Sequence, residues 1–199
     1  KYDPNGQLVK EYPIRNEHGG ASISGFCESR NHEIIISVWN GRVYHLDKEK
    51  DEFIPYPDKM RSRNPTVMVQ DNEQDYFWLA TWGDGVVRFD PSAPGDSMFV
   101  YSEIPVNAAG EEDGLILSLA QDDKLGYIWL TTGHDFMALQ IQPDRTLKQL
   151  KFSAGLLPVN HMLVEVLKGK ECLWVSAFDR PSFILHLMDN ITKDYALPA

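Results

Sequence analysis

The chain has 199 residues, of which 43% are hydrophobic and 24% charged, and its formal net charge is −10 at neutral pH. This length and composition are typical of a globular protein whose core needs no disulfide or metal for stability. The excess of acidic side chains argues against nucleic acid and anionic membrane surfaces as partners, because both are negatively charged. No apolar run approaches the ~20 residues of a membrane-spanning helix, so we expect no direct membrane insertion.

A strand-like segment occurs four times along the chain. It reads IIISVWNGRVYHLD from Ile34, YFWLATWGDGVVRFD from Tyr76, YIWLTTGHDFMALQ from Tyr127 and CLWVSAFDRPSFILHL from Cys172. When the four segments are aligned, the anchor residues are 43, 51 and 45 positions apart: Ile35, Trp78, Trp129 and Trp174. A repeat of this length with strand character and no helical stretch is typical of β-propeller blades.

Each repeat is expected to contain four short strands, separated by polar or glycine-containing turns. The strands expected in the four repeats cover residues 22–27, 33–38, 42–46 and 52–55; 66–70, 76–81, 86–90 and 98–103; 115–121, 127–132, 136–141 and 147–152; and 161–167, 172–177, 183–187 and 194–197. The repeats end in a polar turn and an apolar strand, and most close with a proline. Residues 1–14 have the same form, which predicts the outer half of a truncated blade.

The predicted fold class is therefore all-β: a β-propeller fragment of about four four-stranded antiparallel blades plus a leading half-blade. The expected parts of this single domain, residues 1–199, are the half-blade at 1–14 and blades at about 20–57, 65–105, 114–153 and 159–198. A fragment that opens in the middle of a blade has unpaired strand edges, which favour pairing with another chain. We therefore expect a homodimer, and the total blade number of an intact ring stays open.

Two motifs carry a resemblance to a known family. The first runs from Gly114 through Asp122, Gly126 and Trp129 to Gly133, and the second is WLATWGDGVVRFDP from Trp78 to Pro91. They resemble the two-component regulator propeller repeat. The resemblance implies the periplasmic sensor region of a hybrid two-component system of gut Bacteroidetes-type bacteria, which detects oligosaccharides and signals to a histidine kinase. It implies that this fragment is not itself an enzyme.

The repeated residues are expected to have structural roles. Trp78, Trp129 and Trp174 would pack between blades, and Thr81 and Thr132 would form hydrogen bonds at strand ends. Cys27 and Cys172 lie in apolar runs and are interpreted as buried free thiols. The resemblance is weaker where Ile35 replaces the tryptophan of the repeat and where Phe178 to Pro181 replaces its glycine-rich turn.

Non-repeated residues at the loops are better candidates for ligand binding. In a propeller, the turns between second and third strands lie on the same face as the connections between blades. Exposed tryptophan beside polar side chains suits carbohydrate, because the ring stacks on a sugar while polar groups bond its hydroxyls. A packing role for Trp39 and Trp82, which occupy equivalent positions, is the alternative. The candidate residues are Trp39, Asn40, Arg63, Trp82, Asp84, Asn107, His134, Asp135, Asn160, Asp179 and Arg180.

No pattern in the sequence indicates a catalytic, metal or cofactor site. Residues 111–113 lack the spacing of a calcium loop, and the six histidines show no metal-ligand spacing. Two alternatives to the sensor hypothesis stay open. A propeller-fold enzyme such as a lyase needs ionisable groups that converge at the ring centre. A protein–protein scaffold of the WD-repeat kind needs a broad apolar patch.

Overall fold

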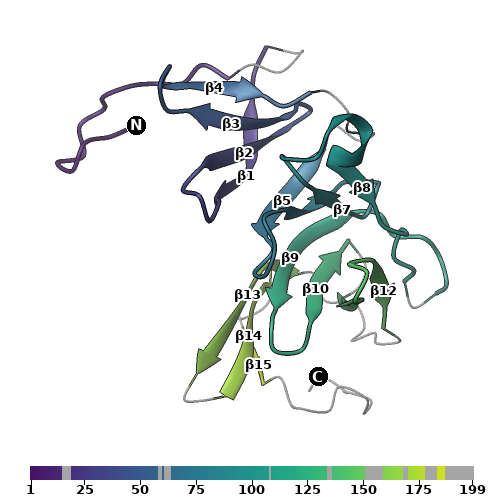
Figure 1. Ribbon diagram of the computed structural model, residues 1–199. Helices are drawn as coiled ribbons and strands as arrows, with labels where there is room; N and C mark the ends of the chain where they lie inside the picture. The colour runs from purple at the N-terminus through teal and green to yellow at the C-terminus, as the bar shows by residue number, and fades with distance from the viewer. Residues whose placement is uncertain are drawn as a thin grey trace.

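The computed structural model describes residues 1–14, 19–57, 60, 64–107, 109–133, 136–150, 159–167, 170–177 and 183–186. In the last three ranges it describes the backbone, together with the side chain of Leu173. Four antiparallel sheets follow one another along the chain and form a curved row (Figure 1). This architecture confirms the predicted propeller fragment.

Each of the first three sheets has four strands that pair in sequence order, which is the arrangement of a propeller blade. Blade 1 contains β1 (Ser22–Glu28), β2 (Ile34–Trp39), β3 (Val43–Asp47) and β4 (Glu52–Pro55). Blade 2 contains β5 (Pro65–Gln70), β6 (Phe77–Thr81), β7 (Val86–Phe89) and β8 (Phe99–Tyr101). Blade 3 contains β9 (Ile116–Asp122), β10 (Tyr127–Thr132), β11 (Phe136–Ile141) and β12 (Leu147–Gln149). The described part of blade 4 contains β13 (Val159–Leu167), β14 (Lys170–Ala177) and β15 (Phe183–His186).

The outer strands differ most from the sequence-based expectation. The strand predicted at residues 98–103 is shorter, because Met98 ends a 3₁₀ helix (Gly95–Met98) and only Phe99–Tyr101 pairs with β7. The strand predicted at 147–152 ends at Gln149. The strand predicted at 194–197 lies outside the described residues. At the start of the chain, Tyr2 and Leu8 form an isolated bridge, and the predicted half-blade stays a prediction.

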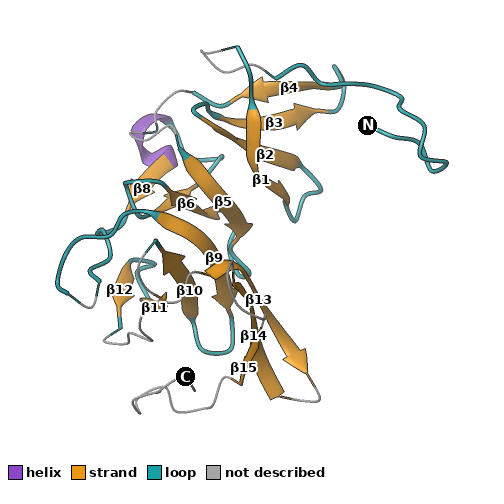
Figure 2. Ribbon diagram, turned by 180° about the vertical axis from the view of Figure 1, so that it is seen from behind, coloured by secondary structure: helices purple, strands orange, loops and turns teal. Residues whose placement is uncertain are grey.

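The hydrophobic core is divided between the interfaces of neighbouring blades. One cluster joins Ile35 and Val43 of blade 1 to Met68, Phe77 and Leu79 of blade 2. A second cluster joins blades 2 and 3, and its members include Trp78, Ala80, Val86, Ile116, Leu119 and Leu130. The inner strands β1, β5, β9 and β13 pack against one another in series (Figure 2). Blade 2 thus buries one face against blade 1 and the other against blade 3.

All four inner strands carry a β-bulge at the same place. The register between first and second strands shifts at Ser24, Thr66, Leu117 and Asn160, each near the start of its strand. A bulge bends a strand and redirects the extra side chain. In blade 2 the bulge residue is Thr66, and its hydroxyl contacts blade 3 by donating to the carbonyl oxygen of Ile116 at 2.6 Å.

Two further features bear on expectations from the sequence. Cys27, in β1, is a free thiol and is only partly buried; burial raises its pKa. The side chain of Cys172 lies outside the described part. Within the described residues, no helix has the length and apolar character that crossing a bilayer requires.

Candidate functional site

The loops of blade 2 come together on one face of the propeller. The turn after β6 lies against the connection that enters blade 2, since the Trp82 amide donates to the carbonyl oxygen of Asn64 at 2.8 Å. It also lies against the connection that enters blade 3, since the Gly83 amide donates to the carbonyl oxygen of Gly114 at 2.8 Å. The predicted gathering of second-to-third-strand turns and interblade connections is confirmed for this blade.

Close backbone contacts hold this turn in place. Gly83 has φ of 122°, a conformation that side-chain-bearing residues rarely adopt. A Cβ at Gly114 would lie 2.2 Å from the Gly83 carbonyl oxygen, so the two segments approach as closely as glycine allows. The Thr81 hydroxyl donates to the Gly85 carbonyl oxygen at 2.8 Å and accepts from the Asp84 amide at 3.1 Å. This is the hydrogen-bonding role that the repeat predicted for Thr81.

Trp82 projects from this turn and meets Trp39, the residue at the equivalent position of blade 1. Their ring centroids are 5.2 Å apart with an interplanar angle of 76°, an edge-to-face pair. Trp82 remains 49% exposed and Trp39 is partly exposed. The two rings therefore pack against each other and still present aromatic surface to solvent.

Polar groups lie in the same two turns. Asn40 follows Trp39, is exposed, and has φ of 53°, which places it in a left-handed turn. In the other turn, the buried Oδ2 atom of Asp84 has no hydrogen-bond partner among the described residues. A buried carboxylate oxygen without a donor is unusual, because such atoms are nearly always hydrogen-bonded.

Asn107 has a local structural role. Its side-chain oxygen accepts hydrogen bonds from the amides of Ala109 and Glu111, both at 3.0 Å. The backbone amide of Asn107 donates to the carbonyl oxygen of Glu111 at 2.8 Å. Asn107 thus shapes the connection between blades 2 and 3.

The other candidates are placed less completely. Asn160 lies on the bulge of β13, and the structure describes its backbone alone. Five candidates lie outside the described residues: Arg63, His134, Asp135, Asp179 and Arg180. Of the predicted set, the structure therefore brings together Trp39 and Trp82, with Asn40 and Asp84 in the same turns.

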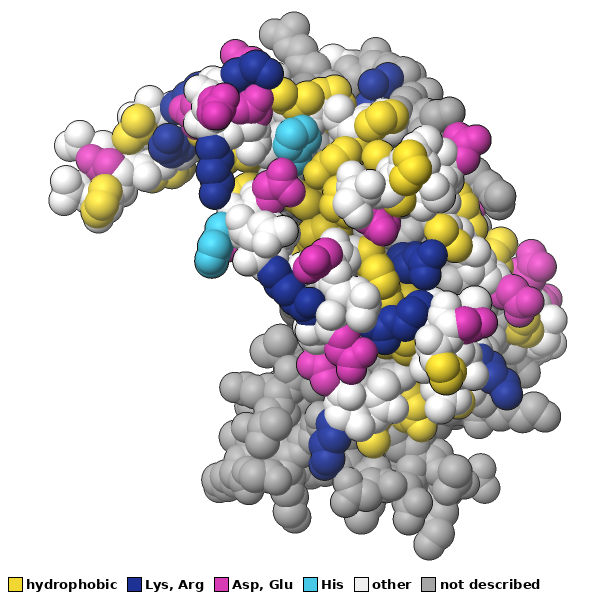
Figure 3. Space-filling view, in the orientation of Figure 1, with side chains coloured by type: hydrophobic (Ala, Val, Ile, Leu, Met, Phe, Trp, Pro, Cys, Tyr) yellow, Lys and Arg dark blue, Asp and Glu magenta, His cyan; other side chains and the backbone are white. Residues whose placement is uncertain are grey.

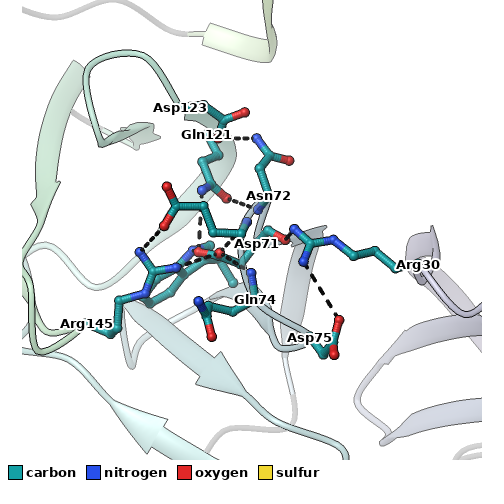
Figure 4. A network of polar contacts seen from close by, with 10 residues as sticks. Arg30, Asp71, Asn72, Gln74, Asp75, Gln121, Asp123 and Arg145 are labelled. Carbon is teal, nitrogen blue, oxygen red and sulfur yellow. Dashed lines mark hydrogen bonds and ion pairs between the residues drawn. The ribbon is translucent and has the colours of Figure 1, made fainter.

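A network of buried polar contacts at the opposite ends of the strands was not predicted from the sequence (Figure 4). Its centre is Asp71, a fully buried residue in the turn between β5 and β6. Asp71 Oδ2 accepts from the indole nitrogen of buried Trp78 at 2.8 Å, and blade 3 repeats the contact between Asp122 and Trp129 at 3.2 Å. In both blades the aspartate precedes the tryptophan by seven positions. That spacing was the signal available in the sequence.

Asp71 also connects three blades. Arg145, in the β11–β12 turn of blade 3, forms an ion pair with Asp71 Oδ1 at 2.9 Å, and its side chain is 22% exposed. Arg30 of blade 1 donates to the Asp71 carbonyl oxygen at 3.0 Å, as Figure 4 shows. Arg145 has φ of 65°, so the chain holds a non-glycine residue in a left-handed conformation at this junction. These contacts indicate that the network stabilises the junction of blades 1, 2 and 3.

A groove of about 670 Å³ lies between the outer strands of blades 2 and 3. The ionisable side chains that line it have both signs: Arg88, Arg145 and Lys148 with Glu103 and Asp144. Figure 3 likewise shows basic and acidic side chains interspersed over one face of the molecule. The groove is therefore not lined by charges of a single sign. Among the described residues, no cluster of three or more His, Cys, Asp or Glu side chains could hold a metal ion.

The fold resembles several solved β-propellers. PorZ, a bacterial surface component of the type-IX secretion system of Porphyromonas gingivalis, has a TM-score of 0.67 at 14% identity, over 91% of this chain and 29% of that one. The extracellular domain of a putative hybrid two-component system from B. thetaiotaomicron has a TM-score of 0.61 at 20% identity, over 87% of this chain and 23% of that one. Virginiamycin B lyase from Staphylococcus aureus has a TM-score of 0.63 at 14% identity, over 95% of this chain and 62% of that one.

At these identities the likeness shows the fold. The chain spans less than a third of the first two structures and about three fifths of the lyase. No family model and no curated protein sequence matches the chain. Extracellular domains of hybrid two-component systems, the class that the repeat motif resembles, are among the structures with this fold.

Proposed function

We propose that this chain is a ligand-sensing propeller segment from the periplasmic sensor region of a hybrid two-component system. In this proposal it detects an oligosaccharide, and the complete protein passes the signal to a histidine kinase. The repeat motif and the likeness to extracellular sensor domains support the sensor role. The segment itself binds its ligand without a cofactor and turns over no substrate.

The observation that carries the proposal is the exposed Trp39–Trp82 pair. A sugar ring has an apolar face formed by its C–H groups and an equator of hydroxyls. An exposed indole can stack on that apolar face, and the edge-to-face contact with Trp39 holds the Trp82 ring in a defined orientation. The exposed Asn40 side chain lies in the adjoining turn of blade 1, where it supplies hydrogen-bonding groups for hydroxyls.

Sensing then follows from differential binding. An oligosaccharide that contacts two neighbouring blades stabilises the arrangement of sensor chains in which both contacts are made. It shifts the population toward that arrangement by its difference in affinity for the two states. The homodimer expected from the sequence would supply the two chains whose arrangement changes.

The experiment is calorimetric titration of this chain, and of the complete sensor region, with a panel of oligosaccharides. We expect Trp82→Ala to weaken binding of the best ligand by about tenfold, the loss that corresponds to ~1.4 kcal/mol of stacking. Val100→Ala, which shortens an exposed side chain on outer strand β8, is the matched control and should leave affinity unchanged.

A lyase is the second candidate, because the fold also resembles virginiamycin B lyase. The same oligosaccharides, and a streptogramin, should therefore be incubated with the protein and analysed for products by mass spectrometry. Absence of binding by every oligosaccharide, together with turnover of any substrate, would reverse the ranking of the two functions.

A further inference from the structure

The groove between the outer strands of blades 2 and 3 occupies a place that the preceding junction fills with side chains. Its volume of about 670 Å³ lies within the range of small-molecule pockets, roughly 300–1,000 Å³. Each of the two blades that form it has four described strands. The internal repeat therefore relates positions in the groove to equivalent positions between blades 1 and 2.

Three aromatic side chains fill the junction of blades 1 and 2 near the outer strands. Tyr56 directly follows β4, and its ring centroid lies 5.1 Å from that of Phe89 in an edge-to-face contact. Phe89 in turn stacks on Phe99, with 4.9 Å between the centroids. Phe89 and Phe99 are buried, and Tyr56 packs against the cluster that contains them. Aromatic rings thus close this junction.

The junction of blades 2 and 3 carries smaller or polar residues at the same positions. Strand pairing and backbone hydrogen bonds make Tyr56 equivalent to Ser102, Phe89 to Leu139, and Phe99 to Gln149. The Gln149 side chain does not replace a ring, because its amide group bonds the backbone N–H and C=O of Val106. The groove therefore corresponds to the volume of the missing aromatic rings.

A basic side chain in the groove also lacks the acidic neighbour that its equivalent has in blade 1. In blade 1, the His45 ring nitrogen Nδ1 lies 3.6 Å from the Glu33 carboxylate. The equivalent pair in blade 2 is Arg88 and Tyr76, and the Arg88 guanidinium carbon lies 5.3 Å from the centre of the Tyr76 ring. Among the described residues, no carboxylate forms an ion pair with Arg88. Because a guanidinium can bond both oxygens of one carboxylate, Arg88 is suited to an anionic group of a ligand.

The other ionisable side chains of the groove differ from Arg88 in their surroundings. Arg145 already pairs with two carboxylates, and the Asp144 carboxylate accepts two hydrogen bonds within its own turn. Glu103 and Lys148 line the groove at exposed positions and have opposite charges. Arg88 is therefore the partly buried cation of the groove that a ligand carboxylate can pair with.

We propose that this groove binds a small aromatic carboxylate. The aromatic ring of the ligand takes the space that Tyr56 fills in the preceding junction and contacts the groove residues Val100 and Leu147. Its carboxylate pairs with Arg88. This inference is independent of the proposed sensing function, because no groove residue belongs to the exposed tryptophan pair.

Protein-observed NMR titration with 3-phenylpropionate tests the proposal, with the uncharged 3-phenylpropionamide as the matched compound. We expect the methyl resonances of Val100 and Leu147 to shift, with a dissociation constant on the order of 1–5 mM for a ligand of this size. The amide should bind at least about tenfold more weakly, because it cannot form the ion pair. Arg88→Gln should weaken 3-phenylpropionate binding about tenfold, to the level of the amide. Lys48→Gln removes the same charge at an exposed position of blade 1 and should change neither affinity.

Ser102→Tyr is a second variant that tests the space itself. It places in blade 2 the residue that closes the preceding junction, so we expect loss of 3-phenylpropionate binding without a fall in the unfolding temperature. Thermal unfolding followed by circular dichroism checks that this variant and Arg88→Gln fold. The proposal is overturned by absence of wild-type binding up to about 20 mM, several times the expected dissociation constant. It is equally overturned if the acid and the amide bind alike, or if either variant binds 3-phenylpropionate as the wild type does.

Discussion

Blades 1 and 2 share strand order and bulge register, yet they secure the turn between first and second strands differently. In blade 2, Asp71 accepts the indole proton of Trp78 and the amides of Glu73 and Gln74. In blade 1 the equivalent positions are Ser29 and Ile35, and the Ser29 hydroxyl accepts the Glu33 amide at 3.0 Å, its one such contact among the described residues.

Between the two blades, the aspartate position and the tryptophan position differ together. A buried indole N–H needs an acceptor, since an unsatisfied buried donor costs ~1–3 kcal/mol. Isoleucine has no such donor, so blade 1 needs only a side chain that closes the turn. The aspartate and the tryptophan therefore form one structural unit. A substitution of this unit in blade 2 can be compared with a substitution at the equivalent position of blade 1, which lacks it.

The largest effect is expected at Asp71. Asp71→Ala removes the acceptor of Trp78 and leaves the largely buried Arg145 guanidinium without this partner, so we expect a loss of about 3–5 kcal/mol in the free energy of unfolding. Urea denaturation followed by tryptophan fluorescence measures it. Ser29→Ala is the matched control in blade 1 and should cost less than about 1 kcal/mol; equal losses would contradict the central role of Asp71.

A smaller effect is expected at Asp122. This carboxylate accepts from Trp129 and from the Leu125 amide, but among the described residues no arginine pairs with it as Arg145 does with Asp71. Asp122→Ala should therefore cost about 1–3 kcal/mol in the same denaturation experiment. A loss as large as that of Asp71→Ala would show that the ion pair with Arg145 adds nothing to the blade 2 junction.

The coupling between Trp39 and Trp82 should be smaller again. A double-mutant cycle of Trp39→Ala and Trp82→Ala is expected to give about 0.5–1.5 kcal/mol, the range for edge-to-face aromatic pairs. The unfolding free energies of the two single variants and the double variant give the coupling. Strictly additive effects would mean that the contact does not hold Trp82 in place.

The smallest effect at neutral pH is expected at Tyr76. Burial, and then the charge of Asp71, raise the pKa of Tyr76 to about 12. The folded pKa lies above the unfolded value near 10, so the stability linked to this group is fully present below about pH 10 and is lost toward pH 12.

Tyr76→Phe tests this dependence. The Tyr76 hydroxyl has no hydrogen-bond partner among the described residues, so the variant should change the unfolding free energy at pH 7 by less than about 0.5 kcal/mol. It should also reduce the loss of stability between about pH 10 and pH 12. Part of the loss should remain, because burial also raises the pKa of Tyr56. An unchanged alkaline profile would show that Tyr76 does not titrate as described.

The repeat pattern was enough to predict the blades, because alternating apolar strands and turn residues are local signals. It placed β6, β7, β10 and β11 within about one residue of their observed bounds. The bulges and the 3₁₀ helix (Gly95–Met98) were missed, because a bulge arises from pairing with another strand and leaves no distinct local pattern.

The candidate site was predicted only in part, for a related reason. Equivalent positions in two repeats identified Trp39 and Trp82, and their contact across a blade boundary followed from the fold. The link between Asp71 and Arg145 spans 74 positions, and no local pattern indicates it. The loop-shaping hydrogen bonds of Asn107 were not predicted, because an asparagine that shapes its own loop has the same composition signal as one that binds a ligand. Its role in ligand binding stays a prediction.

The connection between blades 2 and 3 is closed at its base. Val106 and Glu112 form a bridge, and the Asp113 amide donates to the carbonyl oxygen of Pro105 at 2.8 Å, so Asn107 and residues 109–111 belong to a protrusion with a closed base. Gly114, directly after it, is held against Gly83 and tolerates no side chain. Evolution can therefore lengthen or diversify the protrusion without disturbing the blades, and homologous proteins should differ in loop size there while retaining the glycine.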